Sequence, residues 1–226
     1  MSRVARDFGA ASALYDQHVL VQEDVLLEAS RLLNAHVGRQ SHVLDVGCGT
    51  GRLAQYCDAQ LRGCDIAEGM CAQAPYPADI ANAEALPYVD ASMDATFSSL
   101  VLQWVEDKAQ AFAEMYRVTK AGGACVVATL GPNTLEGLDR LHIPRLMFES
   151  REAYCHYASE AGWRIAEARS EMLRYEHETL LEALRQIKAV GARHKEQRGR
   201  LSRARLMQPF TAEWDMILLE LHKPAQ

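Results

Sequence analysis

The sequence predicts an α/β fold built on a mainly parallel sheet. Short apolar runs of strand length alternate with longer segments in which apolar residues recur at helical spacing. The run Ala124–Leu130 is almost continuously apolar, as expected of a strand that is buried on both faces. A glycine-rich turn follows the strand-like run His42–Val46 and leads into a helix, an arrangement that brings a ligand against backbone N–H groups. The chain has 226 residues, of which 49% are hydrophobic and 24% charged, so we expect a single domain over residues 1–226.

Each element follows from its own stretch of sequence. Apolar residues at helical spacing, among them Val25, Ala29 and Leu32, predict helices within residues 1–37, which we interpret as a helical cap. The expected strands are His42–Val46, Leu61–Asp65, Ala78–Asn82, Asp94–Leu100, Ala124–Leu130, Trp163–Arg174 and Trp214–Leu221. The further expected helices are Arg52–Cys57, Glu68–Ala74, Gln103–Thr119, Arg151–Ala161 and Leu180–Val190. Since a basic helical segment, residues 179–205, separates the last two strands, we expect the final strand to be antiparallel.

Composition excludes several classes of protein. No window approaches 18 consecutive apolar residues, so no transmembrane helix is expected. The N-terminal stretch has no apolar core of a signal peptide, and we expect a cytoplasmic protein. The six cysteines form no C-x-x-C pair, and the sequence contains no H-x-x-x-H or H-E-x-x-H. We therefore expect reduced, packed thiols and no metal site.

The glycine-rich turn has the pattern D-x-G-x-G-x-G, formed by Asp45, Gly47, Gly49 and Gly51. A nucleoside triphosphate loop requires Lys-Ser/Thr after its last glycine, and none follows here. A dinucleotide loop requires Gly or Ala at the sixth position counted from Gly47, and that position is Arg52. The pattern resembles motif I of class I methyltransferases, which bind S-adenosylmethionine (SAM). Glycines permit close backbone approach, and a helix N-terminus favours the carboxylate of the methionyl group.

Two further stretches support a SAM site. Asp65 ends the next strand, where a carboxylate accepts hydrogen bonds from ribose hydroxyls; its alternative role is to cap the following helix. The stretch NAEALP begins at Asn82, where many methyltransferases have Asp, and the amide oxygen of Asn82 can still accept a hydrogen bond from adenine. Residues 38–131 thus form the expected SAM-binding core. The expected cofactor-binding residues are Asp45, Gly47, Cys48, Gly49, Gly51, Asp65, Ile66, Met70, Asn82, Ala83, Glu84 and Ser98.

Four stretches outside motif I resemble one family, the malonyl-[acyl-carrier protein] O-methyltransferases of biotin synthesis. They are FGAASALYDQHVLVQ from Phe8, SSLVLQW from Ser98, TLGPNTL from Thr129 and IKAVGARH from Ile187. Ser99 stands where the family has Asn, and the segment from Leu138 to Arg145 is shorter than usual there. The resemblance implies a seven-stranded Rossmann-like sheet with helices on both faces, and a substrate-lid insertion at residues 132–150. It also implies methyl transfer from SAM to the free carboxylate of a malonyl thioester, at the start of pimeloyl synthesis for biotin.

A malonyl carboxylate is ionised at neutral pH, so we expect no general base and no catalytic residue in that sense. The site must instead align the reacting groups, exclude water and select a carboxylate. Arg145 lies in the expected lid and suits a carboxylate, although a loop arginine at the surface is the alternative. Spacing alone allows Tyr15 and Trp104 to be packed aromatics. The expected substrate-binding residues are Arg145, Tyr15, Gln103, Trp104 and Thr129.

Basic residues are concentrated near the C-terminus of a chain whose net charge is −6. Residues 185–205 contain eight Lys or Arg residues and one acid, Glu196. We expect this segment to dock an acidic acyl carrier protein that bears the malonyl group, with an affinity that depends on salt. Malonyl-coenzyme A is the alternative donor. The alternative interpretation of the basic segment is a solvated helix face. The pI near 5.8 argues against nucleic acid, and an apolar face for a membrane is missing, so we expect neither partner. Separately, we expect a monomer. The expected docking residues are Arg185, Lys188, Arg193, Lys195 and Arg198.

Two other functions stay open from the sequence. One is a SAM-dependent methyltransferase of another small carboxylic acid or of a phenol; of these two, the phenol enzyme would need a base instead of Arg145. The other is a SAM-binding partner protein without activity. Fold alone does not choose among them.

Overall fold

The computed structural model describes residues 20–189 and 202–225. Seven strands form one sheet in the order β3-β2-β1-β4-β5-β7-β6. All neighbours pair in parallel except β7, which is antiparallel to both β5 and β6. The expected α/β fold with an antiparallel last strand is therefore confirmed. The strands are β1 (His42–Val46), β2 (Gln60–Asp65), β3 (Ala78–Ile80), β4 (Met93–Ser99), β5 (Thr119–Leu130), β6 (Arg164–His177) and β7 (Phe210–His222).

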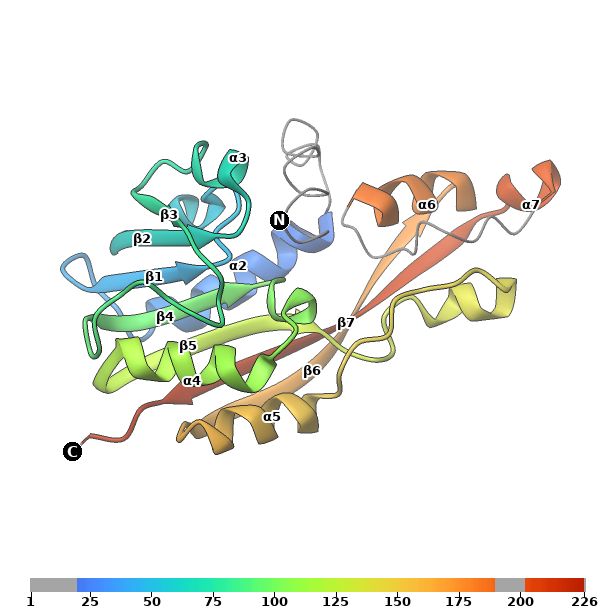
Figure 1. Ribbon diagram of the computed structural model, residues 1–226. Coiled ribbons are helices and arrows are strands. Elements are labelled where there is room, and N and C mark those ends of the chain that lie inside the picture. Colours follow the sequence, from blue (N-terminus) through green and yellow to red (C-terminus); the bar gives the residue numbers. More distant parts are fainter. Residues whose placement is uncertain (1–19, 190–201, 226) are drawn as a thin grey trace.

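Helices cover both faces of the sheet, as Figure 1 shows. On one face, α2 (Leu20–Asn34) and α6 (Leu180–Ala189) bury apolar side chains against β5 and β7. On the other face, α4 (Lys108–Val118) and α5 (Arg151–Glu160) pack over a second apolar cluster that includes the fully buried Tyr154. The short helices α3 (Glu68–Cys71) and α7 (Arg203–Leu206) lie outside these layers. Burial of both faces explains why the Ala124–Leu130 part of β5 carries almost only apolar side chains.

Two expected helices were wrong in part. Residues Arg52–Gln55 form a short 3-10 turn, not the helix expected over Arg52–Cys57. The helix expected to begin at Gln103 begins only at Lys108, because the side chain of Asp107 accepts a hydrogen bond from the Gln110 amide and caps the helix there. Leu102–Trp104 form a separate 3-10 turn that precedes this cap.

The stretch KAGG, residues Lys120 to Gly123, is part of a strand. β5 begins at Thr119 and runs through these residues, and the pairing with β4 shifts register between Met93 and Ala95. Gly122 adopts φ +78°, and a Cβ on Gly123 would lie 2.6 Å from the Asp94 carbonyl oxygen. The glycines therefore accommodate an irregularity within the strand pair.

The outer halves of β6 and β7 extend past the rest of the sheet. β7 pairs with β5 only from Met216 to His222, whereas its pairing with β6 continues to Phe210. In Figure 1 this two-stranded extension reaches toward α6 and α7. Among the described residues, none of the helices has the length and apolar character needed to span a bilayer.

Candidate active site

The glycine loop after β1 adopts backbone conformations that only glycine readily allows. Gly47, Gly49 and Gly51 have φ values of +76°, +54° and +78°. A Cβ on Gly47 would lie 2.2 Å from a Val101 methyl group, and one on Gly51 would lie 2.5 Å from Pro75. By contrast, no atom lies within 4 Å of a Cβ built on Gly49. Gly47 and Gly51 thus permit close packing of the loop, while Gly49 borders open space.

The carboxylate of Asp65, at the end of β2, lies against this loop. Its Oδ2 accepts a hydrogen bond from the Gly49 amide at 3.0 Å, and its Oδ1 accepts one from the Ala67 amide at 2.8 Å. A carboxylate has about four acceptor positions, so each oxygen keeps capacity for a ligand hydroxyl. Burial raises the pKa of Asp65, and the amide hydrogen bonds oppose that effect.

The second acid, Asp45, is almost fully buried at the end of β1. The Tyr76 hydroxyl donates a 2.6 Å hydrogen bond to its Oδ2. Burial raises the pKa of Asp45 to about 7, Tyr76 opposes this, and the charge of Asp65 adds to it. Two neighbouring acids that are partly desolvated favour a ligand with positive charge.

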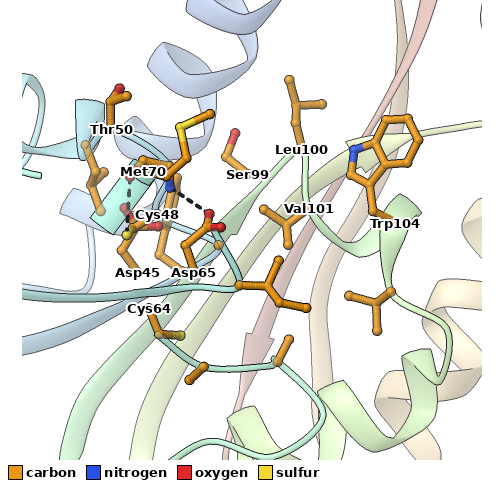
Figure 2. Close-up of a pocket in the computed structure, with 18 of the residues that line it drawn as sticks. Asp45, Cys48, Thr50, Cys64, Asp65, Met70, Ser99, Leu100, Val101 and Trp104 are labelled. Carbon is orange, nitrogen blue, oxygen red and sulfur yellow. Dashed lines mark hydrogen bonds between the residues drawn. The ribbon is translucent and has the colours of Figure 1, made fainter. Parts of the chain in front are cut away.

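One cavity of about 320 Å³ opens between the loop after β1, the end of β2 and the segment after β4. This volume lies in the range of small-molecule sites. Figure 2 shows Asp45, Cys48, Asp65 and Met70 on one side of the cavity and Leu100, Val101 and Trp104 on the other. Of the expected cofactor-binding residues, those that line it are Asp45, Gly47, Cys48, Gly49, Asp65, Ile66, Met70, Asn82, Ala83 and Glu84.

The wall made by Asn82–Glu84 is fixed by hydrogen bonds. The Asn82 side-chain oxygen accepts from the Glu84 amide at 3.2 Å, which is a turn of the Asx type. Glu84 Oε1 accepts from the amides of Glu106 and Asp107 and so joins this wall to the segment before α4. The amide oxygen of Asn82 is therefore engaged locally and has one remaining acceptor position for adenine.

Ser98 and Gly51 do not line the cavity. Ser98 is buried within β4, and its hydroxyl donates to the Val46 carbonyl at 3.0 Å. Ser99 lines the cavity instead, because successive side chains of a strand point to opposite faces. The alternation in β4 could have indicated this. Sequence reasoning also missed Gln22, Leu26, Thr50 and Val101, which line the cavity from α2 and from loops.

The expected substrate residues fall into separate places. Trp104 lines the cavity, and with Gln103 it borders a small adjoining hollow. Thr129 is fully buried; its hydroxyl donates to Gln103 Oε1 at 3.0 Å and lies 3.4 Å from the Tyr154 hydroxyl. This hydrogen bond holds the Gln103 side chain in place. Tyr15 lies outside the described residues.

Arg145 is held by the loop after β5 and is not among the residues that line the cavity. Its Nε donates to Asp139 at 3.0 Å, and its Nη1 donates to the carbonyls of Pro132 and Thr134. Among the described residues no hydrogen bond of Nη2 is found, so that nitrogen keeps its donors for an anion. The expected lid thus contains a short 3-10 helix, Glu136–Leu141, and the guanidinium of Arg145 fixes the loop that precedes this helix.

The basic segment is described in part. Arg185 and Lys188 are exposed on α6, whose opposite face buries Leu184 and Ile187. Arg203 and Arg205 are exposed on α7. Arg193, Lys195 and Arg198 lie outside the described residues.

Comparisons with known proteins agree with this geometry. A family model described as "Methyltransferase domain" matches residues 44–127, which include the glycine loop and Asp65. The malonyl-[acyl-carrier protein] O-methyltransferase of Pseudescherichia vulneris is 33% identical over 211 residues, covering 84% of this chain and 80% of the relative. The chain belongs to the family of malonyl-[acyl-carrier protein] O-methyltransferases. It is a SAM-dependent methyltransferase, and SAM is its methyl donor.

Two other matches add detail. The biotin biosynthesis bifunctional protein BioHC of Teredinibacter turnerae is 33% identical over 222 residues, but the chain spans only 38% of that relative's length. The crystal structure of a SAM-dependent methyltransferase from Thermotoga maritima superposes with a TM-score of 0.63 at 18% identity, over 96% of this chain and 99% of that one. The structural likeness shows the fold alone.

The residues of the cavity fit SAM. The open space at Gly49 admits close approach of a ligand to backbone, and Asp65 has acceptor capacity for ribose hydroxyls. The buried acid Asp45 suits the ammonium of the methionyl group, and the neighbouring negative charge suits a sulfonium cation. Burial raises the pKa of the Cys48 thiol, so this side chain is neutral and contributes packing.

Proposed function

We propose that this methyltransferase converts the free carboxylate of a malonyl thioester on acyl carrier protein to its methyl ester, the start of pimeloyl synthesis for biotin. The observation that carries the proposal is the similarity to curated relatives named for this reaction, over most of the chain and most of the relative. The cavity supports it, because its chemistry fits the cofactor that the reaction requires.

The chain's own contribution is positioning. SAM supplies an electrophilic methyl group when bound. The malonyl carboxylate is already ionised at neutral pH, so the chain has no proton to remove. Asp65, Asp45 and the glycine loop fix one reactant, and Trp104 and Leu100 supply apolar walls that exclude water next to it. Alignment and desolvation of this kind account for large rate enhancements without any acid or base.

Selection of a carboxylate falls to the region beyond β5. Arg145 offers its Nη2 to the malonyl carboxylate while Nε and Nη1 hold the lid. Gln103 is oriented by Thr129 and, with Trp104, borders the small hollow beside the cavity. Tyr15, which lies outside the described residues, is assigned to substrate binding only because it stands in the family-like stretch that begins at Phe8. Arg185 and Lys188, together with Arg193, Lys195 and Arg198, form the docking surface for the acidic carrier, and the chain acts as a monomer.

Parallel turnover assays test the proposal. Purified chain and labelled SAM are offered malonyl-carrier protein, malonyl-coenzyme A, free malonate, acetyl-carrier protein and a simple phenol, each at low and high salt. We expect the highest kcat/KM with malonyl-carrier protein, a decrease at high salt, and no transfer to the acetyl form. Transfer to the phenol, or tight SAM binding without transfer to any malonyl species, would contradict the proposed substrate.

A further inference from the structure

Two histidines and one glutamate from opposite ends of the chain meet at the end of the sheet where the parallel strands begin. His36 lies in the turn after α2, whereas Glu220 and His222 lie two residues apart in β7 and so project from the same face of that strand. The Nε2 atoms of both imidazoles lie 3.0 Å from the same oxygen, Oε1 of Glu220. One ligand atom of each residue lies within 4.8 Å of the other two.

The cluster is ordered by packing and is still reachable from solvent. The two imidazole rings meet edge to face, with centroids 4.9 Å apart and planes at 84°. The side chains of His36, Glu220 and His222 are 21%, 17% and 24% exposed. Partial burial limits the rotamers that the three ligands can adopt, and the exposed fraction leaves a path by which an ion can enter.

The donor set favours zinc over hard cations. Two imidazole nitrogens and one carboxylate oxygen are ligands that Zn²⁺ prefers, whereas Mg²⁺ and Ca²⁺ prefer oxygen. Zinc bonds to such atoms at about 2.0–2.2 Å, which places ligands of a tetrahedral site roughly 3.3 Å apart. The observed 3.0 Å contacts therefore require only small side-chain adjustments to admit the ion.

The surrounding charges do not oppose a cation at Glu220. In strand register Glu167 lies opposite Glu220, and its carboxylate approaches Arg169 at 3.2 Å. Arg169 is also paired with Glu28 of α2, so its charge is shared by two acids. Arg164, opposite His222, is exposed to water.

We propose that His36, Glu220 and His222 form a Zn²⁺ site, with a water molecule as the fourth ligand. The ion joins the end of the helix whose first turns line the cofactor cavity, at Gln22 and Leu26, to the last strand of the sheet. α2 has 15 residues and is therefore about 22 Å long, so the ion stabilises this helix at its far end and takes no part in methyl transfer.

Zinc titration of chelator-treated protein without a histidine tag tests the site. Calorimetry should give one Zn²⁺ per chain, Co²⁺ should give the visible absorption of a tetrahedral site, and Zn²⁺ should raise the melting temperature. Glu220→Gln, His222→Gln and His36→Gln should each weaken binding at least tenfold, because even loss of an outer-shell partner costs that much. His156→Gln, at an exposed position of α5, is the matched control and should bind Zn²⁺ as the wild type does.

The binding of S-adenosylhomocysteine, the demethylated product, reports folding in every variant. His36→Gln changes only a turn residue and so keeps the test decisive where a β7 variant fails to fold. The absence of Zn²⁺ binding in the wild type would overturn the proposal, as would equal binding by the three variants and the wild type. Methyl transfer is measured in the same samples and should be unchanged, so failure of the zinc site leaves the proposed function intact.

Discussion

Two parts of the molecule, the cofactor half around the glycine loop and the proposed substrate half beyond β5, are built in different ways. The cofactor half takes Asp45, the glycine loop and Asp65 from 21 consecutive residues, and β1 and β2 pair directly. The substrate half joins the loop at 131–134 to Asp215, because the Asn133 amide and side chain both donate to that carboxylate. The first half is specified locally and the second by contacts across the whole chain. Variants in the first should therefore abolish SAM binding, and variants in the second should change substrate use.

The largest effect is expected from Asp65→Ala. Loss of this carboxylate removes the oxygens that we propose accept from the ribose hydroxyls, and it removes the anchor of the Gly49 amide. Hydrogen bonds to charged groups contribute about 1.5–3 kcal/mol each, so S-adenosylhomocysteine should bind about a hundredfold more weakly or worse. Calorimetry measures this. Asp79→Ala, which removes an acid paired with Arg62 at the surface, is the control and should bind normally.

A matched pair of glycine variants separates folding from binding within the loop. Gly47→Ala drives a Cβ into Val101 at a positive φ and should cost about 2–3 kcal/mol of unfolding free energy. Gly49→Ala meets no atom and should cost about 1 kcal/mol, while its methyl group occupies space near the ligand. Denaturant melts and calorimetry distinguish the two. Equal destabilisation by both variants would contradict the packing described here.

Arg145→Ala tests the substrate half. It should lower kcat/KM for malonyl-carrier protein about tenfold to a hundredfold and leave S-adenosylhomocysteine affinity unchanged, because one charged hydrogen bond to the substrate is lost. Arg140→Ala, on the exposed side of the same segment, should have little effect. Asp139→Asn removes only the ion pair at Nε. If it causes the same loss as Arg145→Ala, the guanidinium acts by bracing the lid and not by contacting the carboxylate.

The pH dependence of cofactor binding tests Asp45. Its pKa is about 7 in the fold against 3.8 in a model peptide, so the ligand-free protein holds a proton there at pH 6. A ligand ammonium favours the ionised form; affinity should therefore rise up to about tenfold per pH unit below 7 and level off above it. Because the folded state holds this proton more tightly than the unfolded state, the contribution of Asp45 to the unfolding free energy decreases as pH rises from about 4 to about 7. Asp45→Asn should remove both the pH dependence of ligand affinity and this contribution to the pH dependence of unfolding free energy.

The smallest effect concerns docking. Arg185→Ala combined with Lys188→Ala should lower kcat/KM for the carrier-bound substrate by a few-fold, mainly through association, and weaken its salt dependence. Malonyl-coenzyme A turnover should not change. Arg31→Ala, on α2, removes an exposed charge from another helix and is the control. An equal loss with both thioesters would place these residues outside the docking surface.

The cofactor half was largely predictable because its residues follow one another in a motif. Its errors are local: Ser98 was chosen where strand alternation favours Ser99, and the pattern of Asp107 followed by Gln110 marks a helix start that spacing alone missed. In the other half, resemblance indicated Arg145, but no spacing rule could predict that its Nε and Nη1 are bound to the loop. The contact between His36 and Glu220 depends on how α2 packs against β7, two elements far apart in the sequence, so no local motif could predict it.

Mass spectrometry of the carrier protein after turnover tests the central claim most directly. Malonyl-carrier protein incubated with SAM and the chain should gain the mass of one methyl group in place of a proton, on the malonyl group, and lose it on ester hydrolysis. Acetyl-carrier protein, which lacks the carboxylate, should gain nothing. A methyl group found on the acetyl form or on the carrier polypeptide, or no mass gain on the malonyl form with SAM bound, would contradict the account.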